Sequence, residues 1–163
     1  MKGTLAYPPG GMYDEGDERI TMGEFTLRAT VEAPYEQTVE HVKELLADAG
    51  FGVLTEIDIA ATLKAKLGVE RQPQIILGAC RPHLAHRALE ADPRIASMLP
   101  CNVVVTSETT DRTRVEAFDP AVMTSFSDVD EIGLVAHEAR RRLTQVIDGL
   151  TTGSEGERHA VGA

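Results

Sequence analysis

The pattern of apolar and polar positions along the chain predicts five β-strands. Apolar and polar residues alternate over residues 25–33, as expected of a strand with one buried face. A second alternating stretch covers residues 53–59. Three shorter apolar runs, each bounded by turn-forming residues, predict the remaining strands at residues 75–79, 102–105 and 115–118.

Two long helices accompany these strands. Over residues 35–49 apolar side chains recur at helical spacing, and Gly50 is suited to a left-handed helix end. Residues 129–150 carry the longest helical pattern in the chain. The polar residues 107–112 predict a turn. Shorter helical pieces are predicted at residues 60–67, 82–91 and 95–99, and directly after Asp119-Pro120.

This order of elements predicts an α+β two-layer sandwich. We expect a largely antiparallel sheet of about five strands, with two long helices on one face. The other face would be uncovered, and such a face often binds a second copy of the chain, so we expect a homodimer. Residues 24–150 are expected to form the single folded domain. Residues 1–23, rich in Gly, Pro and acidic side chains, predict a flexible arm, and residues 151–163 predict a polar tail.

The charge and composition of the chain argue against two classes of binding partner, nucleic acids and membranes. The 163 residues include 26 acidic and 16 basic side chains, which gives a formal net charge of −10. Because nucleic-acid binding depends on clustered Lys and Arg, the sequence argues against a nucleic-acid partner. No stretch is long enough to span a membrane and no signal peptide is visible, so we expect no membrane partner and a cytoplasmic location.

The only two cysteines, Cys80 and Cys101, are the main candidates for chemistry. Cys80 closes the apolar run at residues 75–79, and Cys101 opens the run at residues 102–105. If these runs pair as neighbouring antiparallel strands, the end of one lies beside the start of the other and the thiols approach. Cys80 also precedes a predicted helix, and the positive end of a helix dipole favours the reactive thiolate.

Three chemistries fit a close pair of thiols, and the sequence leaves all three open. The thiols could form a reversible disulfide, bind a thiophilic metal ion such as Zn or Cu(I), or simply pack as small apolar groups. A metal site would want further ligands, and His83, three residues after Cys80, is the candidate. The alternative for His83 is a place on an exposed helix surface.

Glu56 and Asn102 are further candidate ligand-binding residues. Glu56 shares a predicted strand face with the apolar Leu54, so if that face is buried the carboxylate needs an arginine or a ligand as its partner. Asp58, on the same face, is instead placed to cap the short helix that follows. Asn102 follows Cys101 directly and could orient a ligand or cap a turn.

Five segments carry a resemblance to a known family. They are GFGVLTEID at residues 50–58, ATLKAKLG at 61–68, ILGACRP at 76–82, AHRAL at 85–89 and LPCNVVV at 99–105. In this order they resemble domain of unknown function 302, a small bacterial and archaeal α/β domain. The resemblance implies a fold similar to the TATA-binding-protein-like β-α-β(4)-α arrangement and agrees with a dimer. It implies no established enzyme activity and does not include the acidic arm.

The leading hypothesis is an uncharacterised cytoplasmic binding module. Its site would be centred on Cys80 and Cys101 and would take a metal ion or a thiol-reactive small ligand. A first alternative is a thiol redox or sulfur-transfer enzyme with Cys80 as the nucleophile, which requires a thiol pKa well below about 8.5. A second alternative is a purely structural or interaction domain in which both cysteines are core filler.

Overall fold

A five-stranded antiparallel sheet forms the centre of the fold. The computed structural model describes residues 24–152. All neighbouring strands pair antiparallel, in the order β1-β5-β4-β3-β2. The sheet with its helices confirms the predicted α+β class. The strands are β1 (Thr26–Val31), β2 (Gly52–Asp58), β3 (Gln74–Cys80), β4 (Cys101–Thr109) and β5 (Arg112–Phe118).

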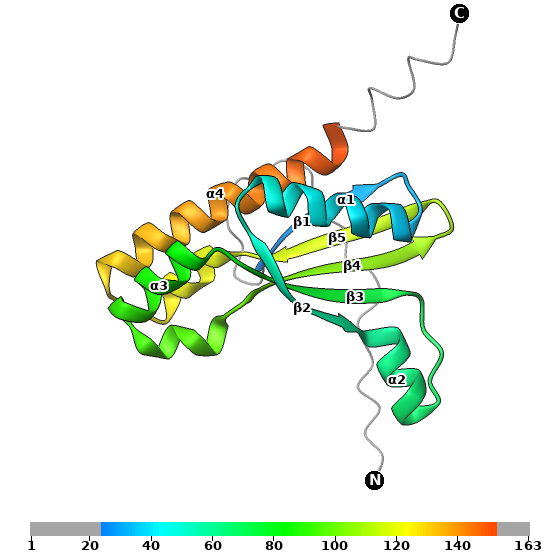
Figure 1. Ribbon diagram of the computed structural model, residues 1–163, viewed down its shortest axis with the longest axis horizontal. Helices are drawn as coiled ribbons and strands as arrows, with labels where there is room; N and C mark the ends of the chain where they lie inside the picture. Colours follow the sequence, from blue (N-terminus) through cyan, green and yellow to red (C-terminus); the bar gives the residue numbers. More distant parts are fainter. Residues whose placement is uncertain (1–23, 153–163) are drawn as a thin grey trace, which may run out of the picture.

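Two long helices lie on one face of this sheet (Figure 1). They are α1 (Tyr35–Asp48) and α4 (Asp130–Thr152), and their apolar stripes are buried against the strands. The TATA-binding-protein-like arrangement stays a prediction. The shorter elements are α2 (Ile59–Leu67), α3 (Pro82–Ala91) and the 3-10 helices η1 (Pro93–Met98) and η2 (Pro120–Ser125).

The apolar core has two parts. The larger cluster joins α1, α4 and the centre of the sheet, and includes the fully buried Leu46, Val103 and Leu143. The smaller cluster packs α3, η1 and η2 against the first half of α4, and includes Leu84 and Ile132. Helix α3 is therefore held by α4 as well as by its connection to β3.

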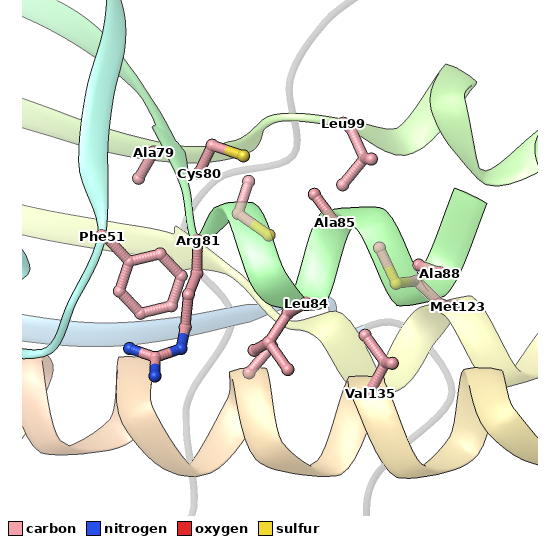
Figure 2. A pocket seen from close by; sticks show the side chains of 12 residues that line it. Phe51, Ala79, Cys80, Arg81, Leu84, Ala85, Ala88, Leu99, Met123 and Val135 are labelled. Carbon is pink, nitrogen blue, oxygen red and sulfur yellow. The ribbon is translucent and has the colours of Figure 1, made fainter. Parts of the chain in front are cut away.

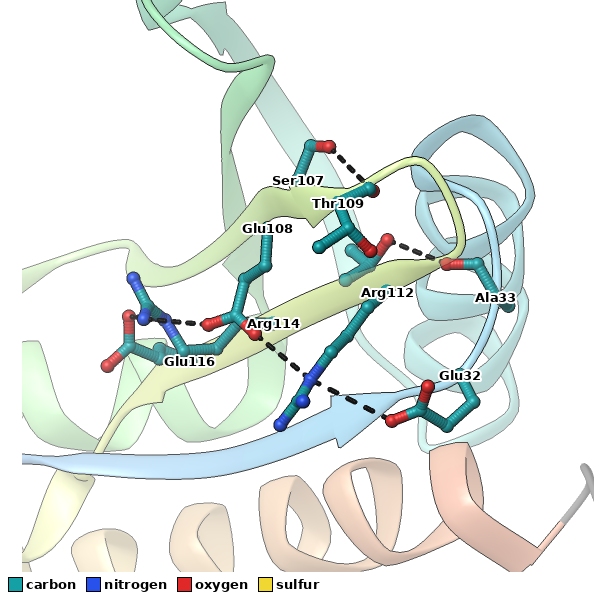
Figure 3. Close-up of polar contacts among 9 residues, drawn as sticks. Glu32, Ala33, Ser107, Glu108, Thr109, Arg112, Arg114 and Glu116 are labelled. Atoms are coloured by element: carbon teal, nitrogen blue, oxygen red, sulfur yellow. Dashed lines mark hydrogen bonds and ion pairs between the residues drawn. The ribbon is translucent and has the colours of Figure 1, made fainter.

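The hairpin of β4 and β5 is longer than the pattern predicted. The predicted turn over residues 107–112 is too long: β4 extends to Thr109 and β5 begins at Arg112, so the turn is confined to residues 110–111. Two hydroxyls on these strands are buried yet paired with carbonyls (Figure 3). Ser107 Oγ donates to Thr109 O at 3.2 Å, and Thr113 Oγ1 donates to Ala33 O at 2.9 Å. The bonds offset the cost of burying these polar groups, so polar residues can stand inside a strand.

A β-bulge interrupts the alternation of β2. An unbroken alternation would put Val53 and Ile57 on one face, but the register shifts between Val53 and Thr55. Val53 packs against the core on the helix side, whereas Ile57 lies on the other face and is 45% exposed. The inserted residue, Leu54, is exposed.

The sheet face opposite α1 and α4 has a charged half and an apolar half. In the charged half, Arg114 pairs with Glu108 at 3.0 Å and with Glu116 at 3.2 Å (Figure 3). Arg112 pairs with Glu108 at 3.2 Å and with Glu32 at 3.7 Å. We call these five side chains the ion-pair network. Across β2, β3 and β4, the register aligns Ile57, Ile76 and Val104, which we call the apolar row.

The predicted segments at the two ends of the chain lie largely outside the residues that the structure describes. The predicted arm, residues 1–23, lies outside the described residues. Helix α4 continues to Thr152, so it includes the start of the predicted tail, and the rest of that tail also lies outside. Among residues 24–152, no helix combines the length and apolar character needed to cross a membrane.

Candidate functional site

Strand register brings the two cysteines to one end of the sheet. In the antiparallel pair of β3 and β4, Ala79 lies opposite Cys101, and Cys80 is the next residue of β3. Both thiols are free. Both line the same small cavity between the sheet and α3 (Figure 2). Cys101 is 6% exposed and Cys80 is half-buried, so the site is reached from the Cys80 side.

The cavity is small and almost entirely apolar. Its volume is about 30 Å³, which is space for one or two water molecules or an ion. Drug-sized ligands occupy pockets of about 300–1,000 Å³, so a bulky organic ligand does not fit without rearrangement. Met123 of η2 adds a thioether to the two thiols. The other lining residues are Phe51, Ala79, Arg81, Leu84, Ala85, Ala88, Leu99, Val135 and Ala139.

Burial makes both thiols weaker acids. It raises the pKa of Cys80, so the predicted activation of this thiol by the start of α3 is wrong. Burial also raises the pKa of Cys101 to about 11, and the neighbouring Cys80 contributes a smaller part of that shift. Loss of hydration disfavours the charged thiolate. Both sulfurs are therefore protonated at neutral pH.

Arg81 does not supply its charge to the thiols. Figure 2 shows its side chain running from the start of α3 towards α4, away from the Cys80 sulfur. Its Nη1 donates to Ala49 O, at the C-terminal end of α1, at 3.1 Å. Arg142 of α4 donates to the same carbonyl at 3.4 Å. Two cations at a helix C-terminus stabilise its dipole, so this arginine is engaged structurally, although its buried Nε has no hydrogen-bond partner.

The predicted three-ligand metal site is not assembled. His83 is exposed on α3 and does not line the cavity. Among residues 24–152, no group of three or more His, Cys, Asp and Glu side chains is placed to hold a metal ion. The prediction that Cys80, Cys101 and His83 together bind a metal ion is therefore wrong. His83 lies in the first turn of α3 with its imidazole in solvent, whereas both thiols line the cavity.

The structure separates Glu56 from the cysteines. Its carboxylate lies 2.9 Å from Lys43 Nζ of α1, an ion pair rather than the expected arginine or ligand. Hydrogen bonding to Glu56 is the main reason that the pKa of Lys43 is raised. Asp58 accepts a hydrogen bond from Ala61 N at 2.8 Å, which confirms its predicted cap of α2.

Asn102 also lies apart from the cysteine cavity. It alternates with Cys101 and Val103, whose side chains face the core, and so lies on the sheet face opposite α1 and α4. There it lines a groove of about 350 Å³. The groove is distinct from the cysteine cavity, although Leu99 contributes to both. We call it the open-face groove, and its other lining residues are Ser97, Met98, Pro100, Phe118, Val122 and Phe126.

Met123 is the lining residue that sequence reasoning missed. It lies in a short 3-10 helix that joins β5 to α4, and it is buried in the smaller core cluster. No spacing in the sequence connects it to Cys80 or Cys101. The one signal in the sequence was a sulfur-containing side chain shortly after Asp119-Pro120, a pair that predicts the start of a helix. Asp119 does cap η2, because its carboxylate accepts a hydrogen bond from Ala121 N at 2.9 Å.

Comparisons with known proteins define the family and no activity. No curated protein matches the chain. A crystal structure of an uncharacterized conserved DUF302 protein from Bacillus stearothermophilus is similar, with 27% sequence identity and a TM-score of 0.69. The similarity covers 76% of this chain and 96% of that one. The family model described as "Domain of unknown function DUF302" matches residues 27–150, and the chain therefore belongs to the DUF302 family.

Proposed function

We propose that this domain is a binding module for a soft monovalent metal ion, with Cu(I) as the best-fitting ion. The observation that carries the proposal is the pair of thiols lining one small apolar cavity, with the thioether of Met123 in the same wall. Sulfur donors select Cu(I) over hard cations, which prefer oxygen ligands. The volume of about 30 Å³ suits an ion better than an organic molecule.

Zn fits this site less well than Cu(I). A structural Zn site takes four ligands, usually Cys and His. The described residues offer the two thiols without a third His, Cys, Asp or Glu close enough to join them. Cu(I) is satisfied by fewer, softer ligands, so two thiolates with a thioether nearby are sufficient.

Binding exchanges protons for the ion. Two S–H bonds break, two Cu–S bonds form, and two protons leave to solvent, with no electron transferred. Because burial raises the pKa of both thiols, proton competition is strong at neutral pH. We therefore expect the affinity to rise with pH, by up to about a hundredfold per pH unit when both protons are displaced. The thiols must stay reduced, which supports placement in a reducing compartment such as the cytoplasm.

The test is an anaerobic titration of the reduced full chain with Cu(I), in competition with a colorimetric Cu(I) chelator. We expect one ion per chain, and a loss of at least about a hundredfold in affinity for Cys80→Ser and for Cys101→Ser. Met123→Leu keeps the side-chain volume and should weaken binding by a smaller factor. His83→Ala is the matched control, because its imidazole is exposed and outside the cavity.

Three results would contradict the proposal. Unchanged affinity in both serine variants would remove the cysteines from the site. Rapid alkylation of Cys80 with an apparent pKa below about 8.5 would instead support the thiol enzyme considered from the sequence. Complete protection of both thiols from alkylation, with no Cu(I) uptake, would favour core filler.

We further propose that the chain forms a homodimer through the apolar row on the uncovered sheet face. Ile57, Ile76 and Val104 lie in register across three strands, on the sheet face opposite α1 and α4. The adjacent ion-pair network carries both signs of charge. In a two-fold arrangement the same patch meets itself, so opposite charges can be brought together around the apolar contact.

A further inference from the structure

We propose that the open-face groove is a docking site for the chain's own N-terminal segment, in particular residues 18–23. This inference is independent of the Cu(I) proposal, because the occupied surface is the groove and not the cysteine cavity. The occupant is a segment outside the described residues. The case rests on where that segment joins the fold, on the lining of the groove, and on the spacing of its apolar residues.

The N-terminal segment joins the fold at the wall of the groove. Thr26, the first residue of β1, lies directly opposite Phe118, which lines the groove. The preceding residue, Phe25, accepts a hydrogen bond through its carbonyl from Asp119 N at 2.8 Å. Chain connectivity then keeps Met22 within about 14 Å of Thr26, since each residue spans at most about 3.6 Å.

The groove offers an apolar surface that the described fold leaves open. Its volume is about 350 Å³, more than ten times that of the cysteine cavity. Phe126, at its rim, is 64% exposed. Together with the apolar Met98, Phe118 and Val122 it forms a group of apolar side chains around the groove, and such a group is a candidate surface for binding another segment. The polar groups of Ser97 and Asn102 in the lining can pair with a bound backbone.

The spacing of the segment matches the face on which the groove lies. Alternate residues of a strand face the same side, so Thr26 lies with Arg28 and Thr30 on the sheet face opposite α1 and α4. Ile20 and Met22 are separated from Thr26 by an even number of positions, six and four. If the extended backbone of β1 continues toward the N-terminus, both apolar side chains are presented to that face.

Limited trypsin digestion of the full chain tests this inference. Docking of residues 18–23 should shield the peptide bond after Arg19, and the fragment that begins at Ile20 is measured by mass spectrometry. Phe126→Ser removes the exposed rim of the groove, and Met22→Ser removes an apolar contact without altering the cleaved bond. We expect each variant to be cut at Arg19 about fivefold faster than the wild type or more.

Leu134→Ser is the matched control. Leu134 is 61% exposed, close to the value for Phe126, but it lies on α4 outside the groove lining. We expect its cleavage rate at Arg19 to equal that of the wild type. Thermal unfolding of all variants confirms that the fold is intact.

Two outcomes would overturn the inference. Equal cleavage at Arg19 in the wild type, Phe126→Ser and Met22→Ser would show that the segment does not occupy the groove. Protection that rises with protein concentration would show that a second copy occupies the groove in its place. Neither outcome bears on Cu(I) binding, which is measured separately.

Discussion

At the scale of single residues, Asp92 shows how this fold treats a buried charge. It lies before η1 and accepts hydrogen bonds from Arg94 N, Nε and Nη2 at 3.1, 2.9 and 2.8 Å. The hydroxyl of Ser127 donates to the same carboxylate at 2.8 Å. These partners hold the pKa of Asp92 well below its ordinary range, with the Arg94 hydrogen bond as the largest cause. The carboxylate is therefore a stabilising group and not a site for acid–base chemistry at neutral pH.

The pKa of Asp92 predicts a defined pH dependence of stability. Because the folded pKa lies below the unfolded value of about 3.9, the carboxylate stabilises the fold above that pH. The contribution is lost as the pH falls through the folded pKa. We expect Asp92→Asn to lower the Tm at pH 7 by about 4 °C or more, and the difference from the wild type to narrow below about pH 4.

Asp111→Asn is the control for this measurement, because Asp111 is exposed in the turn between β4 and β5. Thermal unfolding across the pH series should show no comparable loss for that variant. A deficit of Asp92→Asn that is the same at every pH would mean that the carboxylate charge does not matter.

At the scale of elements, two helices end on a glycine in the left-handed conformation. Gly50 after α1 has φ +84°, and Gly68 after α2 has φ +67°. Their surroundings differ. A Cβ on Gly50 would collide with the guanidinium of Arg81, whereas nothing lies within 4 Å of a Cβ on Gly68. Gly50 therefore serves both the helix end and the close approach of Arg81 to Ala49 O.

The two glycines form a matched pair for mutation. Gly68→Ala introduces backbone strain alone and should lower the free energy of unfolding by about 1–2 kcal/mol. Gly50→Ala adds displacement of Arg81 and the loss of its hydrogen bond, so its loss should be larger by about 1–3 kcal/mol. Chemical denaturation measures both, and equal losses would show that the contact with Arg81 contributes nothing.

Helices and strands whose apolar residues recur at regular spacing could be predicted from the sequence. Strand ends whose buried polar side chains depend on hydrogen bonds could not. The five strands and both long helices follow the apolar pattern closely. The ends of β4 and β5 were not predicted, because the buried hydroxyls of Ser107 and Thr113 are paired with carbonyls that the apolar pattern does not reveal. The carbonyl that pairs with Thr113 belongs to Ala33, 80 residues away in the sequence. The strand-end placement of Cys80 and Cys101 was predictable from the same runs. Their raised pKa values were not, since these depend on packing from α3, η2 and α4.

At the scale of the whole molecule, the sheet is covered on one face by α1 and α4 and is open on the other (Figure 1). The open face carries the apolar row, the ion-pair network and the open-face groove. This asymmetry divides the molecule into a thiol site on the helix side and contact surfaces on the other side. The proposed assembly and the proposed ion binding would therefore draw on different residues and could be altered separately.

The proposed dimer gives a prediction at this scale. Ile57→Asp places a charge in the exposed apolar row, and burying it unpaired in a contact would be costly. By sedimentation we expect the wild type to be dimeric at about 100 μM and Ile57→Asp to dissociate at least about tenfold more readily. Leu67→Asp, at an exposed position of α2, is the control and should remain dimeric. A monomeric wild type would contradict the proposal.

The carbonyl of Ala49 has a consequence for the kinetics of the thiol site. Arg81 joins it from the start of α3, directly beside Cys80, and Arg142 joins it from α4. Opening the first turn of α3 to admit an ion would therefore disturb the contact that also ties α1 to α4. We expect uptake to be slow relative to diffusion, with its rate set by how often that turn separates from the end of α1. The tightness of binding would depend on the sulfurs, and the speed of entry on the contact between Arg81 and Ala49 O.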